Sequence, residues 1–429
     1  MSDTPDYRPM WTELGLDLDK HDALLGVLGR LYADTYLTQP DRPEAMAYFD
    51  FVMGEVHGLR IRELVDARAA GRIVVGAFCV FVPEELVLAV DGVCVGLCAG
   101  ADFGTEAAER TLPRNTCALI KSFFGFGLEK VCPYLQACDV VVGENTCDGK
   151  KKAYEIFADM VPGEFLALDL PNTKSPQGRE VLVAAYRQLM ADLERLAGVT
   201  VTADRLRAGI ATVNAKRRAL HRLAALRRAV PAPISGLDAL LVNQIAFYDD
   251  PVRFTASVEK LCDELEARIG RGEGVVPSET PRVVLSGCPM AVPNWKLPAI
   301  VESSGAVIVG EESCIGERGQ RNLVSDEGDT VDALLDSLVD RYFAVDCAIF
   351  TPNPTRPQHT LDIAGGTRAD GVIHFALQFC SPYQIEAPIL ERRVEAGGVP
   401  VLRIDTDYST EDIEQLRTRV EAFVEQLRG

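Results

Sequence analysis

Two series of short apolar segments, separated by helical or irregular stretches, constrain the fold of this chain more than any other feature. The first series occupies 72–79, 92–98, 139–145 and 164–170, and the second occupies 282–288, 306–313, 343–350, 371–380 and 399–407. Strands that alternate with helices are typical of parallel sheets, because a parallel connection needs a long crossover segment. The pattern therefore predicts an α/β protein with two parallel-sheet, Rossmann-like domains.

Helical periodicity fills the stretches before and between the two series. Leu182, Tyr186, Leu189 and Leu193 fall on one face of a long predicted helix. The segment 270–281 contains Gly and Pro and is typical of a linker. We predict four parts, namely an N-terminal helical segment over 1–70, a first α/β domain over 71–175, a helical insert over 176–275 and a second α/β domain over 276–429.

Charge and hydropathy exclude several classes of protein. The formal net charge of −19 argues against nucleic acid as a partner, because nucleic-acid binding needs a basic surface. No apolar run approaches the roughly 18 residues of a membrane span. The acidic start, MSDTPDYRPMW, lacks the basic and apolar regions of a signal peptide, so we expect a cytoplasmic location.

Cysteine is the residue type whose placement carries chemistry. The chain has 12 cysteines and no C-x-x-C spacing, and a reducing cytoplasm disfavours a disulfide framework. Several cysteines follow or end a predicted strand: Cys79, Cys98, Cys147, Cys288, Cys314 and Cys380, with Cys347 close to another. Ligands of open α/β sheets bind at the carboxyl ends of the strands, so these thiols favour an iron–sulfur or zinc site, although buried core cysteines remain an alternative. Cys94 and Cys262 are expected to be core residues.

One motif occurs twice, as VVGENTCDGKKK (141–152) and IVGEESCIGER (308–318). A helix predicted to begin after Cys147 would offer free N–H groups to a thiolate or an anionic cluster. The lysines at 150–152 either add positive charge there or form a solvated face. RIVVGAFC and RVVLSGC are also alike, but their cysteines are separated along the chain by a different number of residues than Cys147 and Cys314 are. The different separations are explained either by two similar domains whose equivalent elements are only partly preserved or by convergence on one local geometry.

A set of further motifs resembles a known family. GAFCVFVPEELVLAV, LPRNTCALIKSFFGFG, CPYLQACDVVVGENTCDGKKK, SGCPM, VGEESC, QFCSPYQIE and IDTDYS are similar, in order and spacing, to the 2-hydroxyacyl-CoA dehydratase and benzoyl-CoA reductase superfamily. The similarity is greatest to its double-cubane cluster proteins, and it extends from about residue 70 to the C-terminus.

The resemblance implies a ligand set for an [8Fe-9S] double-cubane cluster. The first cubane would take Cys117, Cys147 and Cys380, and the second would take Cys288, Cys314 and Cys347. Three further cysteines lie in family-like motifs and are alternates, most readily for Cys288: Cys79, Cys98 and Cys132. The two echoing stretches would then each supply one ligand, to different cubanes.

The resemblance also implies a function. It predicts a homodimeric iron–sulfur reductase component that receives low-potential electrons from an ATP-hydrolysing [4Fe-4S] activator homodimer and reduces small molecules. The sequence has no G-x-x-x-x-G-K-[ST] motif, so ATP is expected on the activator. The alternatives are an (R)-2-hydroxyacyl-CoA dehydratase or benzoyl-CoA reductase-like subunit with a single [4Fe-4S] cluster, and a non-catalytic iron–sulfur electron carrier.

Some polar residues near these motifs need a separate interpretation. Glu144 and Glu311 each precede a cysteine by three residues and either support the site, as hydrogen-bonding or proton-donating groups, or serve structural hydrogen bonds. The basic run 214–229 is interpreted as a solvated helix face. His374 lies on an apolar strand and is expected to be a core residue.

Overall fold

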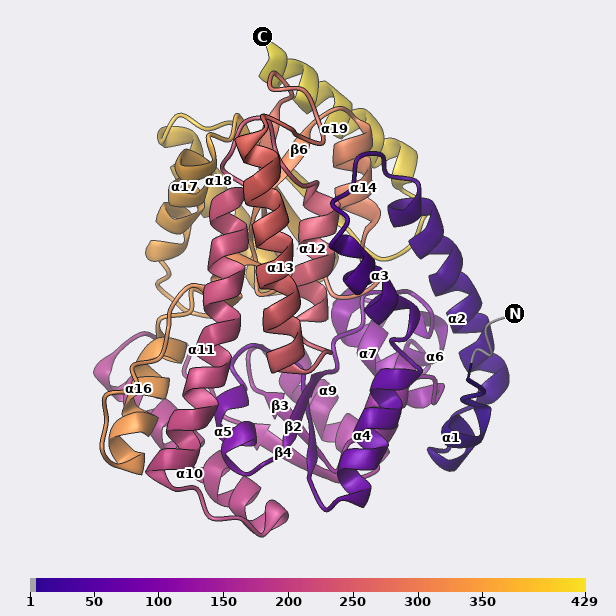
Figure 1. The fold of residues 1–429 in the computed structure, drawn as a ribbon, viewed down its shortest axis with the longest axis vertical. Coiled ribbons are helices and arrows are strands. Elements are labelled where there is room, and N and C mark those ends of the chain that lie inside the picture. The colour runs from indigo at the N-terminus through magenta and orange to yellow at the C-terminus, as the bar shows by residue number, and fades with distance from the viewer. Residues whose placement is uncertain (1–4) are drawn as a thin grey trace.

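The computed structural model describes residues 5–429 and contains two wholly parallel sheets of four strands each (Figure 1). The first sheet has the order β2-β1-β3-β4, with β1 (Val74–Ala77), β2 (Val93–Gly96), β3 (Val140–Glu144) and β4 (Glu164–Leu168). The second has the order β6-β5-β7-β8, with β5 (Arg282–Gly287), β6 (Val307–Glu312), β7 (Gly371–Leu377) and β8 (Val401–Thr406). The predicted fold class is therefore confirmed.

The two sheets share one strand order, so their strands correspond in sequence order, β1 to β5, β2 to β6, β3 to β7 and β4 to β8. The two echoing stretches end strands β3 and β6, which do not correspond. The domains are thus alike in topology, while the echo itself reflects convergence on a local geometry. By position, Cys147 corresponds to Cys380 after the third strand, and Cys79 corresponds to Cys288 after the first.

One predicted strand is absent from the second sheet. Residues 343–350 form the end of a helix followed by turns. Val345, Cys347 and Phe350 are nevertheless buried, because they pack with the core around β1 and β3 of the first sheet. The apolar residues there reflect burial of a loop, which sequence periodicity over a short run does not distinguish from a strand.

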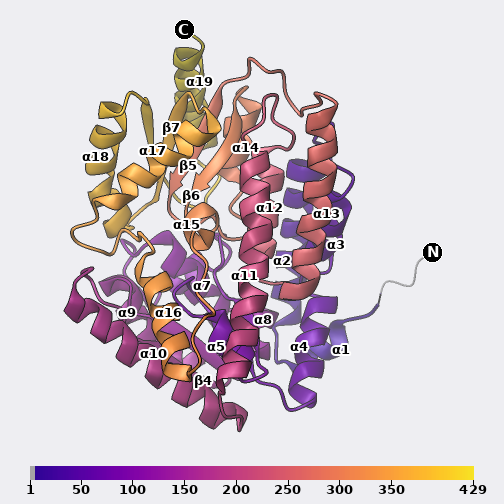
Figure 2. The same ribbon diagram turned by 60° about the vertical axis from the view of Figure 1, so that its left-hand side comes forward.

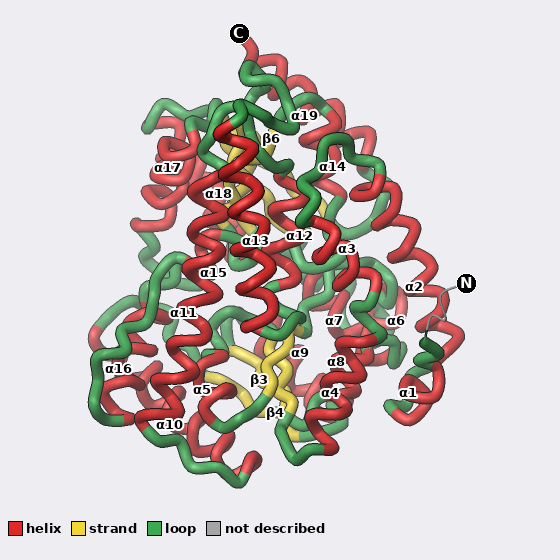
Figure 3. The backbone as a smooth tube through the Cα atoms, viewed as in Figure 1, coloured by secondary structure: helices red, strands yellow, loops and turns green. Residues whose placement is uncertain are grey.

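Helices enclose both sheets, as the backbone trace in Figure 3 shows. The N-terminal segment contains α1 (Arg8–Glu13), α2 (Leu18–Tyr32) with a following π turn (Ala33–Leu37), α3 (Met46–Gly54) and α4 (Leu59–Ala69). The first sheet's connections contain α5 (Glu84–Ala89), α6 (Thr105–Ala108), α7 (Ala118–Leu128), α8 (Pro133–Ala137), α9 (Asp148–Phe157) and a 3-10 turn (Ala158–Met160). Four helices follow: α10 (Pro176–Ala197), α11 (Ala203–Leu226), α12 (Gly236–Ile245) and α13 (Pro251–Gly270). The second half adds α14 (Lys296–Ser303), α15 (Glu317–Gln320), α16 (Val331–Phe343), α17 (Thr355–Thr367), α18 (Ser381–Ala396) and α19 (Ile413–Arg428).

Helix α10 forms for local reasons that the sequence already contains. The side chain of Ser175 caps its first turn by accepting a hydrogen bond from the N–H of Gly178. Its predicted apolar stripe, which includes Tyr186 and Leu193, is buried against the first sheet's core. Gly198 ends the helix in the left-handed conformation, at a φ of 65° that a residue with a Cβ rarely adopts.

Helix α16 belongs to the second half of the chain but lies against α10 of the first (Figure 2). Arg179 on α10 pairs with Asp336 and Asp340 on α16, and the buried face of α16 joins the core of the first sheet. Because α16 packs there, the loop that follows it brings Cys347 close to Cys79, which lies just after strand β1 of the first sheet. Within residues 5–429, no helix is long and apolar enough to span a membrane.

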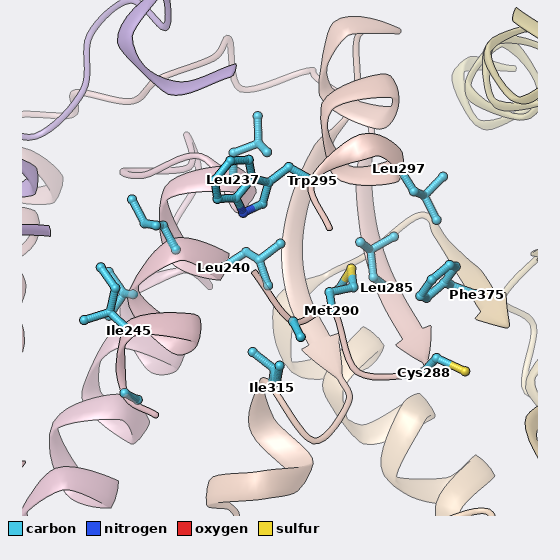
Figure 4. Packing of buried hydrophobic residues seen from close by; sticks show 14 of the residues in the cluster. Leu237, Leu240, Ile245, Leu285, Cys288, Met290, Trp295, Leu297, Ile315 and Phe375 are labelled. Atoms are coloured by element: carbon cyan, nitrogen blue, oxygen red, sulfur yellow. The ribbon is translucent and has the colours of Figure 1, made fainter. Parts of the chain in front are cut away.

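A second, larger core links the remaining elements, and it contains residues from both sheets. Around Trp295 it packs α12 and α14 against strand β5, and Trp295 donates a hydrogen bond from its indole N–H to Gln244 at 2.8 Å. Figure 4 shows Cys288 just beyond the end of β5, at the edge of this cluster and near Phe375. Cys288 thus belongs to this core and stands at the end of strand β5.

Candidate functional site

The carboxyl ends of strands from both sheets border one cavity of about 1100 Å³. Nine of the 12 cysteines line it: Cys79, Cys94, Cys98, Cys117, Cys147, Cys288, Cys314, Cys347 and Cys380. All six predicted ligands are among them, as are two of the three alternates, while Cys132 is not. All 12 cysteines are free thiols. The structure therefore brings the strand-end cysteines of two sheets to one place.

The two cysteines predicted as core residues differ. Cys262 is fully buried on α13, as predicted. Cys94 packs against the core around β1 and β3 but also borders the cavity, so the core interpretation is incomplete for it. It lies on β2, which is an edge strand and so leaves one side free of a neighbouring strand.

Three cavity cysteines share one structural position, directly before a helix. Cys117, Cys147 and Cys380 are the N-cap residues of α7, α9 and α18. The N–H groups that begin these helices have no partner within the helix, and the positive end of each helix dipole lies there. The helix predicted to begin after Cys147 is thus confirmed. We call these three residues the helix-start group.

Contacts within this group are direct. The thiols of Cys117 and Cys380 share a hydrogen bond, and Cys288 contacts Cys380 in the same way. Burial raises the pKa of Cys147, and the nearby backbone N–H groups of Lys150 and Gly149 oppose that rise. An anionic sulfur at this position is therefore stabilised by backbone donors.

A second group consists of Cys79, Cys314 and Cys347, which lie in loops. The thiols of Cys79 and Cys314 share a hydrogen bond, and Cys347 lies close enough to both to interact electrostatically. The hydrogen bond from Cys79 and the nearby Arg318 lower the pKa of Cys314 to about 5, against the opposing effect of burial. We call these three residues the loop group.

The groups differ from the predicted ligand sets at one position. The prediction placed Cys288 with Cys314 and Cys347, whereas in the structure its thiol contacts Cys380 and accepts a hydrogen bond from the N–H of Leu377 at 3.4 Å. Cys79, one of the alternates, lies beside Cys314 instead. Strand order alone allows either contact, because β5, which precedes Cys288, neighbours both β7, which precedes Cys380, and β6, which precedes Cys314.

Glu144 and Glu311 do not occupy equivalent places, although the echo suggested it. Glu144 is fully buried, pairs with Lys150, and lies 3.5 Å from the hydroxyl of Tyr154. Glu311 accepts hydrogen bonds from Arg227 at 2.5 and 2.7 Å. Neither carboxylate lines the cavity, although Lys150 does.

The basic residues flanking the site are divided between buried and exposed positions. Lys150 is buried and lies in the cavity wall, so a solvated face describes only Lys151 and Lys152. In the run 214–229, Lys216, Arg217 and Arg227 are buried and paired with carboxylates, so the prediction of a solvated face is wrong for these three, while Arg218 and Arg228 are exposed as predicted. Arg222 forms ion pairs with three acidic residues of α13. These charges hold helices together, because burying an unpaired charge costs several kcal/mol.

His374 is a core residue, as predicted. Its ring is buried on β7 and burial lowers its pKa to about 3. Nε2 lies 3.4 Å from the carbonyl oxygen of Tyr383. The neutral imidazole therefore serves packing between β7 and α18.

The donor set fits an iron–sulfur group. Thiolates are the preferred ligands of iron–sulfur clusters, and the helix-start group adds backbone N–H groups that favour an anionic guest. The hydroxyl of Tyr408 is buried without a hydrogen-bond partner among the described residues, close to Cys117, Cys288 and Cys380. A buried hydroxyl is normally satisfied, so this one is available to a group bound among those thiols. Within residues 5–429 no three His, Cys, Asp or Glu side chains are arranged around a single ion.

Comparison with known proteins gives a consistent result. The family model of the 2-hydroxyglutaryl-CoA dehydratase D-component matches residues 79–427. The chain is 37% identical over 371 residues to the YjiM protein of Escherichia coli (strain K12), whose name assigns it provisionally to the dehydratase subunits; the match covers 85% of this chain and 94% of that one. It is 27% identical to the (R)-phenyllactyl-CoA dehydratase beta subunit of Clostridium sporogenes, with 83% and 92% covered. It is 24% identical to one of the subunits of benzoyl-CoA reductase from Thauera aromatica, with 83% and 91% covered.

Proposed function

Because this chain belongs to the family of the 2-hydroxyglutaryl-CoA dehydratase D-component, we propose that it is an iron–sulfur reductase component with an [8Fe-9S] double-cubane cluster. Its relatives are subunits of dehydratases and of a reductase, so an enzymatic role is common to the family. The cluster would receive low-potential electrons from an ATP-hydrolysing activator and reduce a small molecule in the cavity.

The observation that carries this proposal is the presence of two thiol groups in one cavity. A single cubane held by three cysteines, with one open iron, would need only the helix-start group. The loop group supplies three further thiols to the same cavity. We assign Cys117, Cys147 and Cys380 to one half, and Cys79, Cys314 and Cys347 to the other. Cys288 then borders the first half, where Cys380 lies.

The chain's own residues prepare the cavity for this chemistry. Iron–sulfur clusters supply one-electron transfer, at potentials of roughly −700 to +450 mV that charge, hydrogen bonds and solvent exposure set. One set of thiols stands at the starts of α7, α9 and α18, where the positive ends of the helix dipoles favour negative charge. Burial of Cys314 and Cys347 limits water at the other. Lys150, held by Glu144, places an ammonium group in the same wall.

A separate activator protein is the first partner that we propose. Its sequence has no phosphate-binding G-x-x-x-x-G-K-[ST] motif, so we propose that ATP is bound and hydrolysed by a separate [4Fe-4S] activator homodimer. We further propose that this chain is a homodimer, which would match a two-fold activator. Light scattering at micromolar concentration tests the dimer, and a strict monomer would contradict it.

A second candidate function is supported by the names of the relatives. Several act on CoA thioesters by name, including the beta subunits of (R)-phenyllactyl-CoA and (R)-2-hydroxyglutaryl-CoA dehydratases. A dehydratase subunit of that kind would hold a single [4Fe-4S] cluster. A non-catalytic electron carrier would hold a cluster without a substrate.

Metal content decides between these functions. Iron and acid-labile sulfide are measured on protein purified without oxygen, and a double cubane requires about eight irons per chain where a single cubane requires about four. Reduction of small test substrates with activator and ATP then separates an enzyme from a carrier. About four irons per chain would refute the double cubane.

A further inference from the structure

A pair of fully buried guanidinium groups lies behind the loop group. Arg318 and Arg356 have no exposed side-chain surface, and each pairs with the buried carboxylate of Glu312 at 3.1 Å. Both also lie over the ring of Tyr383. Arg356 takes a second carboxylate, Glu386, so the four charges of the network balance. Such balance is what makes buried charges tolerable.

One edge of this network reaches the cavity. Nη2 of Arg318 lies 3.7 Å from the sulfur of Cys314, and it also donates to the carbonyl oxygen of Gly287 at 2.9 Å and to the hydroxyl of Tyr383 at 2.6 Å. Its other terminal nitrogen is directed at Glu312. The guanidinium is therefore fixed on three sides, and its position beside the sulfur is determined by those contacts.

The helix-start group has no equivalent. Among the described residues, no arginine side chain hydrogen-bonds to the sulfur of Cys117, Cys147 or Cys380, and these three residues stand at the starts of helices instead. The two thiol groups thus differ in their surroundings, because among the described residues a guanidinium hydrogen-bonds to a sulfur of the loop group and to none of the helix-start group. Hydrogen bonds to cluster sulfurs and nearby charge both set the reduction potential of an iron–sulfur group.

We infer that Arg318 sets the reduction potential of the cluster half bound at Cys314 and makes the two halves electronically inequivalent. The inference rests on the proposed function. Reduction adds negative charge, which a guanidinium beside a ligand sulfur stabilises, so Arg318 raises the potential of that half. The other half, which would lie at the helix starts, does not depend on this side chain. Arg318 is accordingly a positioning and tuning residue, and it contacts a ligand but no substrate.

Arg318→Gln tests the inference by an EPR-monitored redox titration of anaerobic, iron-loaded protein. Glu312 keeps Arg356 as a partner, but Arg356 then serves both Glu312 and Glu386, so the variant leaves the network with one net negative charge. We expect one of the two potentials to fall by about 59 mV, a tenfold change in the equilibrium constant for one electron, and the other to stay. Arg318→Lys should restore part of the shift, because it keeps the charge.

Arg282→Gln is the matched control. Arg282 is also buried, at the start of β5, and its guanidinium donates only to the carbonyl oxygens of Thr367, Ala229 and Arg227. This variant loses a buried cation without a cysteine contact. Both potentials should stay at their wild-type values in Arg282→Gln.

Tyr383→Phe is a second test that keeps the ring and every charge. Without the hydroxyl, Nη2 of Arg318 loses one acceptor and donates more fully to Cys314, so the same potential should rise. Opposite shifts in Arg318→Gln and Tyr383→Phe support the inference. If Arg318→Gln binds no iron, the Tyr383→Phe titration decides it.

Three results would overturn it in distinguishable ways. Protein with about eight irons whose potentials do not move in either variant refutes the tuning role and leaves the proposed function intact. Equal shifts of both potentials refute the inequivalence of the halves. Wild-type protein with about four irons refutes the double cubane and this inference together, because Cys314 would then hold no iron.

Discussion

The ligand set predicted from the sequence contains Cys288, whereas the grouping in the structure contains Cys79, and the two assignments predict different results for substitution of these cysteines. Cys79→Ala removes a thiol that shares a hydrogen bond with Cys314, and a methyl group cannot bind iron. We expect iron to fall from about eight towards about four per chain, with loss of substrate reduction. Cys288→Ala should keep full iron, since its thiol is satisfied by the N–H of Leu377 and by Cys380.

The magnitude for Cys288→Ala follows from its burial. Cys288 is 1% exposed, and removing one sulfur atom from a packed site costs about 1 kcal/mol in transfer and cavity energy. The unfolding entropy of a chain this long is about 0.9 kcal/mol/K, so the Tm should fall by only about 1 °C. Loss of a ligand in Cys79→Ala should lower the Tm by much more, because the proposed cluster would link loops that follow strands of both sheets.

The assay combines iron and sulfide analysis, EPR and thermal unfolding of both variants, all without oxygen. Cys262→Ala is the control, because Cys262 is as buried as Cys288 but lies on α13 away from the cavity. If Cys288→Ala loses half its iron while Cys79→Ala keeps it, the grouping of thiols derived from the structure is wrong. The ligand set predicted from the sequence would then be correct.

Further predictions concern both halves of the site, the pH dependence and the nucleotide. Cys147→Ala and Cys314→Ala should each lower iron towards about four per chain but leave different EPR spectra, since they belong to different groups; identical spectra would contradict two halves. Burial lowers the pKa of His374 in the folded protein to about 3, whereas the histidine of the unfolded chain is protonated below about pH 6.5. Between these two pH values the unfolded state binds one more proton than the folded state, so this residue alone should remove about 1.4 kcal/mol of stability for each pH unit that the pH falls. Urea unfolding at pH 7 and pH 5 should show a steeper loss in wild type than in His374→Gln, and equal losses would refute it. The isolated chain should neither bind nor hydrolyse ATP, and stoichiometric nucleotide binding in a calorimeter would overturn the proposed division of roles.

The sequence by itself determined the architecture and the composition of the site. Apolar segments with helical stretches between them dictate parallel sheets, because each strand must bury both faces and return through a crossover. Cysteines directly after such segments had to meet at strand ends, and all six predicted ligands do line one cavity. The helix start after Cys147 was readable as well, since it depends on local backbone geometry.

Only the tertiary structure decided how the thiols group. Whether Cys79 or Cys288 lies beside Cys314 depends on how the loops of two sheets meet, which no local pattern encodes. The buried loop at 343–350 and the buried Lys216 and Arg217 were misjudged for the same reason, because their neighbours come from segments far away in the chain. Arg318 ends the echoing stretch 308–318, but its role is not readable there, since a guanidinium becomes a tuning group only where a distant tyrosine and a distant strand fix it beside a sulfur. Period and propensity act over a few residues, whereas burial and charge pairing are set by contacts between segments far apart in sequence.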